Sequence, residues 1–200
     1  AEQSIDLLAG LDIRRPKLSR SGFYIDRSGT VVTTSEAVQS CQRLTLDEEY
    51  EAQVVGQNAD LGIAILRPLE SLSPISVATL RNSEPRLQSE VAVSGYSFEG
   101  VLGAPTMTFG LLADLKGLQG EESLARLALA PLPGDAGGPV FDTGGSVLGM
   151  LLPKAADGNK QLPAEVSFAA DAAAIRTVLS EAGVTATSAD PQASMAPEDL

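Results

Sequence analysis

Short apolar runs, separated by glycine, proline or polar residues, recur throughout the chain from Ser21 to Ala170. Many short strands separated by turns are typical of an all-β sandwich or a pair of barrels. The first two runs, Gly22–Ile25 and Thr30–Thr34, flank a turn at Asp26–Gly29 and are expected to form a hairpin. The other runs cover residues 43–46, 51–55, 63–66, 75–78, 91–94, 106–109, 127–129, 139–141, 146–151 and 166–170.

Breaks in this pattern divide the chain. Two prolines at 68 and 74 mark a connection between two β units. After the last run, Asp171 is a good N-cap for an alanine-rich helix over 172–179 that ends at Gly183. We therefore predict an N-terminal extension (1–18), a first β unit (19–74), a second β unit (75–170), a C-terminal helix (171–184) and a loose tail (185–200). The extension contains Ser4–Leu8, expected as a helical turn, and a basic patch at 14–17.

The composition favours a globular chain that does not bind nucleic acid. Hydrophobic residues make up 44% and charged residues 20% of the 200 residues. The net charge of −12 argues against nucleic acid, because phosphate binding needs clustered lysine and arginine. No apolar run approaches the ~18 residues of a membrane span. The chain begins Ala1-Glu2-Gln3 without a signal peptide's basic and apolar regions, so either a signal peptide was removed or the chain is an excised domain.

Cysteine and histidine usage limits the chemistry. Cys41 is the one cysteine, so no intrachain disulfide can form, and we expect it to be a small core residue. The chain has no histidine, the commonest general base and metal ligand. We therefore expect no metal and no cofactor.

A glycine-rich turn at Pro133–Val140 has glycines on both sides of a small residue, followed by an apolar run. Glycine allows backbone conformations closed to other residues. Such a turn can aim successive N–H groups into one concavity that binds an anion or oxyanion.

Within this turn, Gly-Asp-Ala-Gly-Gly-Pro at 134–139 resembles the Gly-Asp-Ser-Gly-Gly-Pro signature of trypsin-like serine peptidases, in their short bacterial form. Ala136 stands where the family has its nucleophilic serine. Residues 21–25 resemble the family's opening strand, and residues 29–38 resemble the strand leading into Thr-Asn-Ala-His-Val-Val, which puts Glu36 at the histidine position. The resemblance covers roughly residues 20–180. It implies two packed antiparallel β-barrels with a C-terminal helix.

The family's triad aspartate has two candidate positions. Residues 60–67 resemble the segment Asp-Leu-Ala-Leu-Leu-Arg, and matching Leu66-Arg67 puts the aspartate position at Gly62. A two-residue shift puts it at Asp60 instead. We favour Gly62, because the shift also needs a bulge or insertion in the following strand. Gly95-Tyr96 and residues 166–170 carry weaker resemblances to a Gly-Tyr-Pro segment and to the closing strand.

The family mechanism needs a serine oxygen, an imidazole to take its proton and a carboxylate to orient the imidazole. Substitution of both the serine and the histidine argues for a natural pseudo-peptidase rather than a single engineered change. The resemblance leaves a backbone oxyanion pocket at Gly134, Asp135 and Ala136. The Glu36 carboxylate is expected either to turn toward these N–H groups or to be solvated or paired with an arginine.

The resemblance also implies a substrate cleft beside the strand at 149–154, which can pair with an extended peptide. Its expected lining residues are Ala130, at the base of the specificity pocket, and Met150, Leu151 and Leu152. Pro153 has no N–H, so the edge offers one donor fewer.

We predict a catalytically inactive homologue that binds a peptide or protein or acts as a regulatory module. We expect it in the periplasm or cell envelope, as part of a longer multidomain protein. The alternatives are an active serine endopeptidase with different catalytic residues and a purely structural domain with a closed cleft.

Overall fold

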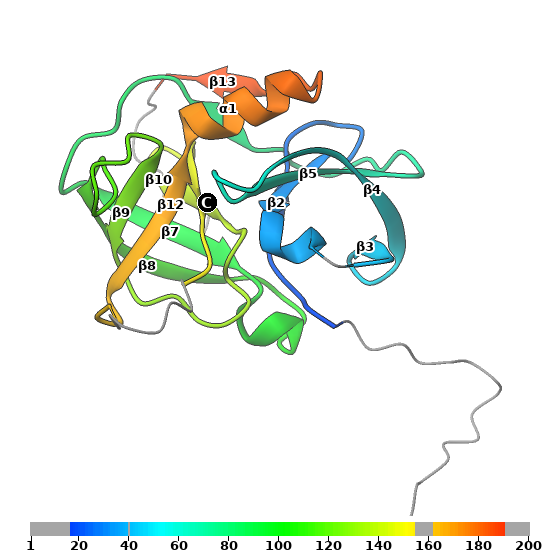
Figure 1. Ribbon diagram of the computed structural model, residues 1–200, viewed down its shortest axis with the longest axis horizontal. Coiled ribbons are helices and arrows are strands. Elements are labelled where there is room, and N and C mark those ends of the chain that lie inside the picture. The colour runs from blue at the N-terminus through cyan, green and yellow to red at the C-terminus, as the bar shows by residue number, and fades with distance from the viewer. Residues whose placement is uncertain (1–16, 40, 155–161, 191–200) are drawn as a thin grey trace, which may run out of the picture.

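Two β-sheets, one in each half of the chain, form the architecture seen in a computed structural model, which describes residues 17–39, 41–154 and 162–190 (Figure 1). The first sheet has the strand order β1-β2-β5-β4-β3, and every neighbouring pair is antiparallel. The expected hairpin is confirmed, with Phe23 opposite Val32. The strands of this sheet are β1 (Gly22–Tyr24), β2 (Val31–Thr34), β3 (Leu44–Leu46), β4 (Tyr50–Asn58) and β5 (Ile63–Pro68).

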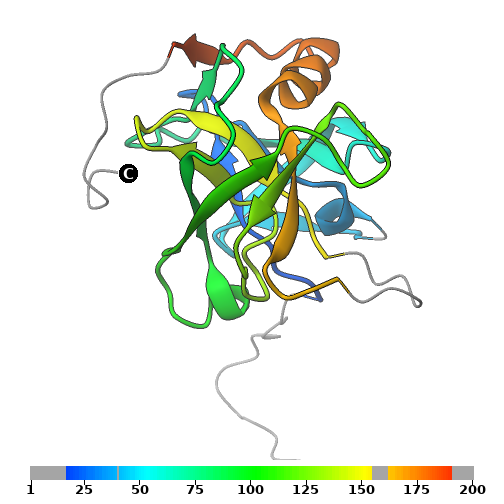
Figure 2. The same ribbon diagram turned by 90° about the vertical axis from the view of Figure 1, so that its left-hand side faces the viewer.

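The second sheet has the order β10-β7-β8-β9-β12-β11-β6-β13, and a further pairing of β10 with β11 closes six of these strands into a barrel. Turned by 90°, this barrel lies in front of the first sheet (Figure 2). Its bounds are β6 (Thr79–Arg81), β7 (Glu90–Gly95), β8 (Thr106–Asp114), β9 (Leu124–Ala128), β10 (Pro139–Asp142), β11 (Val147–Leu151), β12 (Val166–Asp171) and β13 (Thr187–Ala189).

The expected fold class is confirmed, with two differences in detail. The first sheet is a half-barrel, since β1 and β3 are edges that do not pair with each other. In the second sheet, β6 pairs in parallel with both β11 and β13. An expected strand at 75–78 is replaced by an extended connection in which Ile75 is 96% exposed, and β6 begins only at Thr79.

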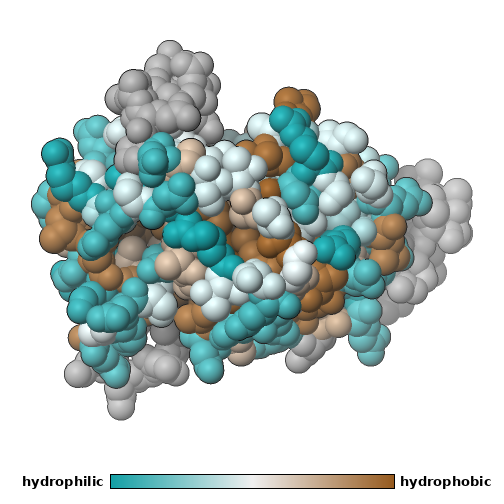
Figure 3. All heavy atoms as spheres, turned by 90° about the horizontal axis from the view of Figure 1, so that it is seen from above, coloured by the Kyte–Doolittle hydropathy of each residue, from teal (hydrophilic) through white to brown (hydrophobic). Residues whose placement is uncertain are grey.

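The C-terminal helix α1 (Ala172–Glu181) begins where the sequence predicts. The Asp171 side chain accepts a hydrogen bond from the Ala174 N–H at 2.6 Å, which satisfies one free amide of the first turn. The tail differs from expectation at β13, because Thr187–Ala189 adds to the edge of β6. Seen from above, the face over which α1 and β13 lie mixes hydrophilic residues with smaller hydrophobic areas (Figure 3).

The main hydrophobic core lies where α1 and both sheets meet. It includes Phe23 and Ile65 of the first sheet, Met150 of the second and Ile175 of α1. A second cluster, around Leu112 and Leu127, fills the closed barrel. The helical turn expected at Ser4–Leu8 lies outside the described residues. Within the described part of the chain, no helix is long and apolar enough to cross a bilayer.

Candidate functional site

The glycine-rich turn leads directly into β10 and is held by backbone hydrogen bonds. Gly134 has φ +98° and Gly137 φ +92°, conformations that favour glycine. Gly137 N–H donates to the Leu151 carbonyl at 2.8 Å, and the Leu151 N–H donates back to Gly138 at 2.9 Å. The turn is therefore fixed to the end of β11, and Ala136 within it is 9% exposed.

Ser21, just before β1, fastens the first sheet to this turn. Its N–H lies 3.1 Å from the Gly134 carbonyl and 3.0 Å from the Ala136 carbonyl. Its hydroxyl donates to Gly134 O at 2.7 Å and accepts from Tyr96 N at 2.7 Å. Its own carbonyl accepts from the Thr33 hydroxyl at 2.7 Å. The two halves of the chain are thus joined at the turn by buried hydrogen bonds.

Asp135 points away from solvent and is 1% exposed. One carboxylate oxygen accepts from the Ser97 hydroxyl at 2.6 Å, and the other accepts from the Leu132 N–H at 2.8 Å. Its role in the structure is to hold the turn to the 3-10 helix η2 (Ser97–Gly100), which follows β7.

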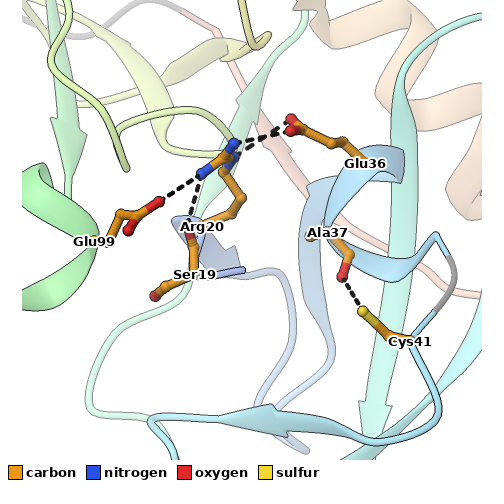
Figure 4. A network of polar contacts seen from close by, with 6 residues as sticks. All are labelled: Ser19, Arg20, Glu36, Ala37, Cys41 and Glu99. Carbon is orange, nitrogen blue, oxygen red and sulfur yellow. Dashed lines mark hydrogen bonds and ion pairs between the residues drawn. The ribbon is translucent and has the colours of Figure 1, made fainter. Parts of the chain in front are cut away.

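Glu36 lies on the 3-10 helix η1 (Ser35–Val38), which follows β2. Arg20 approaches its carboxylate in a forked arrangement, with Nη2–Oε1 at 2.8 Å and Nε–Oε2 at 3.4 Å. Arg20 Nη1 also lies 3.4 Å from Glu99 Oε1 on η2, so the guanidinium stands between the two carboxylates (Figure 4). Of the two arrangements expected for Glu36, the structure shows the ion pair with an arginine and not a contact with the turn's N–H groups. In this arrangement one guanidinium offers two N–H groups to the same carboxylate, which is the bidentate geometry that favours arginine–carboxylate pairs.

Gly62, the favoured aspartate position, is joined directly to η1, because its carbonyl accepts from the Ser35 N–H at 2.9 Å. It has φ +71°, and a Cβ added to it would lie 2.8 Å from a methyl carbon of Leu152. Asp60, the alternative, is exposed in the turn before β5. A side chain at position 62 would therefore require the Leu152 methyl group to shift.

Two of the four residues expected to line a cleft do not do so with their side chains. Met150 is 0% and Leu151 1% exposed, because β11 packs one face into the main core and the other into the barrel core. Leu152 is half-buried and Ala130 is exposed. The open part of this edge is therefore restricted to the residues that follow Leu151.

The groups that the structure places at the site are backbone donors and charged side chains. Among the described residues, no protein acceptor bonds to the N–H of Gly134 or Ala136. Ala136 supplies a methyl group, and no group of three or more potential metal ligands is found in this part of the chain. Cys41 is half-buried, with its Sγ 3.5 Å from the Ala37 carbonyl, and takes no part in the main core (Figure 4).

Sequence reasoning missed Arg20, Glu99 and Ser97 as residues of the site. All three are linked to it only by the fold, since Arg20 and Glu99 lie 79 positions apart. The sequence carries no local signal that would have placed these three residues at the site.

The forked contact should make the Arg20–Glu36 pair more strongly coupled than Arg20–Glu99. We expect a double-mutant cycle of Arg20→Ala and Glu36→Gln to give a coupling of about 1 kcal/mol, because Arg20 is 16% exposed and the contact is close. The parallel cycle with Glu99→Gln should give less than about 0.5 kcal/mol, since Glu99 is 55% exposed and more distant. Urea unfolding at low salt measures both couplings, and equal values would contradict this ranking.

Comparisons with known proteins agree with this fold. The chain is 28% identical over 175 residues to an uncharacterized protein, y4bJ, of Sinorhizobium fredii, covering 82% of this chain and 27% of the relative. It is 29% identical over 157 residues to the chloroplastic Protease Do-like 1 of Arabidopsis thaliana, covering 68% and 33%. The chain therefore spans only about a third or less of the length of these curated relatives.

Two solved structures share the fold. An inactive form of a serine-to-alanine mutant of Rv3671c from Mycobacterium tuberculosis superposes with a TM-score of 0.65 at 24% identity, covering 83% of this chain and 82% of that one. A serine endoprotease from Yersinia pestis gives a TM-score of 0.67 at 18% identity, with coverages of 83% and 58%. At these identities the likeness concerns the fold.

A match to a protein-family model shows to which family the chain belongs. The model of the trypsin-like peptidase domain matches residues 20–150, well over half of the sequence, and this range holds η1, β5 and the glycine-rich turn. The chain belongs to the trypsin-like peptidase domain family.

Proposed function

We propose that this chain is a catalytically inactive trypsin-like peptidase homologue that binds an extended peptide or a protein segment without cleaving it. The observation that carries the proposal is Ala136. The turn that presents the nucleophilic serine in the family presents only a methyl group here. The chain contains no histidine, and the carboxylate at the histidine position is held by Arg20. A peptidase mechanism of this type needs both a nucleophile and a base to take its proton.

Leu152 beside Gly62 adds a second obstacle to catalysis. An aspartate introduced at Gly62 would meet the Leu152 side chain and would have to adopt φ +71°. Restoring the triad therefore requires more than replacing Ala136.

Binding remains chemically supported. The N–H groups of Gly134 and Ala136 are donors without a protein acceptor among the described residues, and Ala130 is exposed nearby in sequence. An extended peptide can use free backbone donors and a strand edge even where no bond is broken. The net charge of −12 favours ligands that are not acidic. We further propose that the domain works in the periplasm or cell envelope within a longer protein.

Activity is tested first with a fluorophosphonate probe, which labels an activated serine covalently. We expect no adduct with the parent chain or with Ala136→Ser, because the variant gains a hydroxyl but no base. An adduct on the parent chain would overturn the proposal in favour of an active endopeptidase.

Binding is tested with fluorescein-labelled, reduced and carbamidomethylated lysozyme, an unfolded basic protein, followed by fluorescence anisotropy and by gel for cleavage. We expect saturable binding, with the lysozyme chain remaining intact. Ala130→Arg should weaken binding at least fivefold, whereas Ala128→Arg, also exposed but on β9, serves as the matched control. No saturable binding, or equal effects of both substitutions, would favour a structural domain with a closed cleft.

A further inference from the structure

Four large apolar side chains are exposed on two neighbouring loops beside the site, and we call this set the η2 patch: Phe98, Val101, Leu102 and Leu132. Their exposed fractions are 50%, 82%, 56% and 42%. The two loops that carry them are joined, because the Phe98 N–H donates to the Pro133 carbonyl at 2.6 Å. Exposed apolar patches on soluble domains commonly mark interaction sites.

The backbone of this loop is held in a costly conformation that presents these side chains. Phe98 has φ +56° and Glu99 φ +58°, the left-handed region that non-glycine residues rarely adopt. Bonds from Gly100 N to Tyr96 O and from Val101 N to Phe98 O keep the turn closed. Such strain persists where the surroundings require it, and it is concentrated at functional contacts. Here the strained residues bury little apolar area within the described part of the chain.

We propose that residues 4–13 of the same chain dock on the η2 patch. These ten residues lie outside the described part, and their sequence supplies the matching chemistry: five large aliphatic side chains, at Ile5, Leu7, Leu8, Leu11 and Ile13. Contact between aliphatic and aromatic surfaces is driven by removal of both from water. This inference goes beyond the proposed function and does not depend on it.

The first described residues lie next to η2, which supports residues 4–13 as the segment that docks on the patch. Arg20 Nη1 lies 3.4 Å from Glu99 Oε1, so the N-terminal end of the described residues is already in contact with η2. The two segments lie on the same side of the molecule, at the bottom of both views (Figures 1 and 2). Six residues lie between Ile13 and Arg20, and the seven steps from one to the other span at most about 23–25 Å in an extended chain. Residues 4–13 can therefore reach the patch.

The charge pattern fits the same arrangement. Residues 14–17 include Arg14, Arg15 and Lys17, the basic patch of the extension. The Glu99 side chain, beside the η2 patch, is 55% exposed, and its carboxylate lies 3.4 Å from the Arg20 guanidinium. It can therefore accept a second cation. The apolar residues of 4–13 thus match the apolar η2 patch, and the basic residues of 14–17 match the acidic Glu99 beside it. Because both partners belong to one chain, their effective concentration is high and modest contacts suffice.

Disulfide trapping tests the proposal in the 200-residue chain. In a Cys41→Ser background, Leu8→Cys is combined with Leu102→Cys, and the control pair is Leu8→Cys with Ile75→Cys. Ile75 is 96% exposed, and its carbonyl accepts from Arg27 in the β1–β2 turn, at the end of β1 opposite to Arg20. We expect intramolecular disulfide formation at least tenfold faster for the 8–102 pair than for the 8–75 pair.

Each other outcome overturns the proposal. Equal rates for the two pairs would mean that residue 8 has no preferred position. Disulfides only between chains would show that a second copy occupies the patch. As a second readout, Leu7→Ser/Leu8→Ser should raise the fluorescence of the apolar dye ANS at least twofold, and adding Phe98→Ser should reverse this. Unchanged dye binding would mean that the η2 patch is not covered by this segment and is left for an external partner.

Discussion

Replacing Gly137 by alanine should lower the free energy of unfolding by about 3 kcal/mol or more, through combined backbone strain and steric overlap. A Cβ at this position would overlap the Ser21 carbonyl oxygen and lie 3.0 Å from the Thr33 hydroxyl. Ser21 cannot move aside easily, because its N–H, carbonyl and hydroxyl are all engaged in hydrogen bonds. The substitution would therefore break the attachment of the first sheet to the turn.

Gly120→Ala is the matched control for this effect. Gly120 has φ +90°, close to the +92° of Gly137, but a Cβ there would meet nothing within 4 Å. Its cost should be limited to the strain of a left-handed alanine, about 1 kcal/mol. Urea unfolding followed by circular dichroism gives both values. A loss at Gly137 no larger than that at Gly120 would show that Ser21 and the turn separate without penalty.

The sequence predicted the elements whose determinants are local. The hairpin of β1 and β2 follows from two β-type runs around a short turn, and α1 follows from Asp171 ahead of an alanine-rich segment. The parallel pairing of β6 with β11 and β13 could not be predicted, because it joins segments far apart in the chain. Nor does a three-residue strand such as β13 carry a pattern that distinguishes it from a polar tail.

The candidate site was predictable where a backbone conformation demands particular residues. Glycines at 134 and 137 indicated the turn, and both have positive φ. The partner of Glu36 was left open, because solvent, backbone donors and several arginines were all compatible with the sequence. Burial of both faces of β11 also could not be foreseen: the strand lies between two cores, so Met150 and Leu151 are equally hidden.

The buried carboxylate of Asp135 is hydrogen-bonded to neutral donors, and these bonds link the turn to η2. Within the described residues, Asp135 has no cationic partner, and its oxygens accept only from Ser97 and Leu132. Ser97 Oγ also lies 2.5 Å from Thr106 Oγ1, and either hydroxyl can be the donor in that pair. This freedom matters, because Ser97 can turn its hydrogen toward Thr106 and become an acceptor.

Asp135→Ala should therefore lower the free energy of unfolding by about 3 kcal/mol, because it leaves the Leu132 N–H unpaired and opens a small cavity. Asp135→Asn should cost less than about 1 kcal/mol: its amide oxygen accepts from Leu132, its NH₂ donates to Ser97, and a neutral amide is cheaper to bury than a carboxylate. Adding Ser97→Ala to Asp135→Asn should remove most of this rescue, since the amide loses its acceptor. Chemical unfolding of the three variants measures these losses in the free energy of unfolding. Equal losses for asparagine and alanine would mean that the negative charge itself, and not its hydrogen bonds, stabilises the turn.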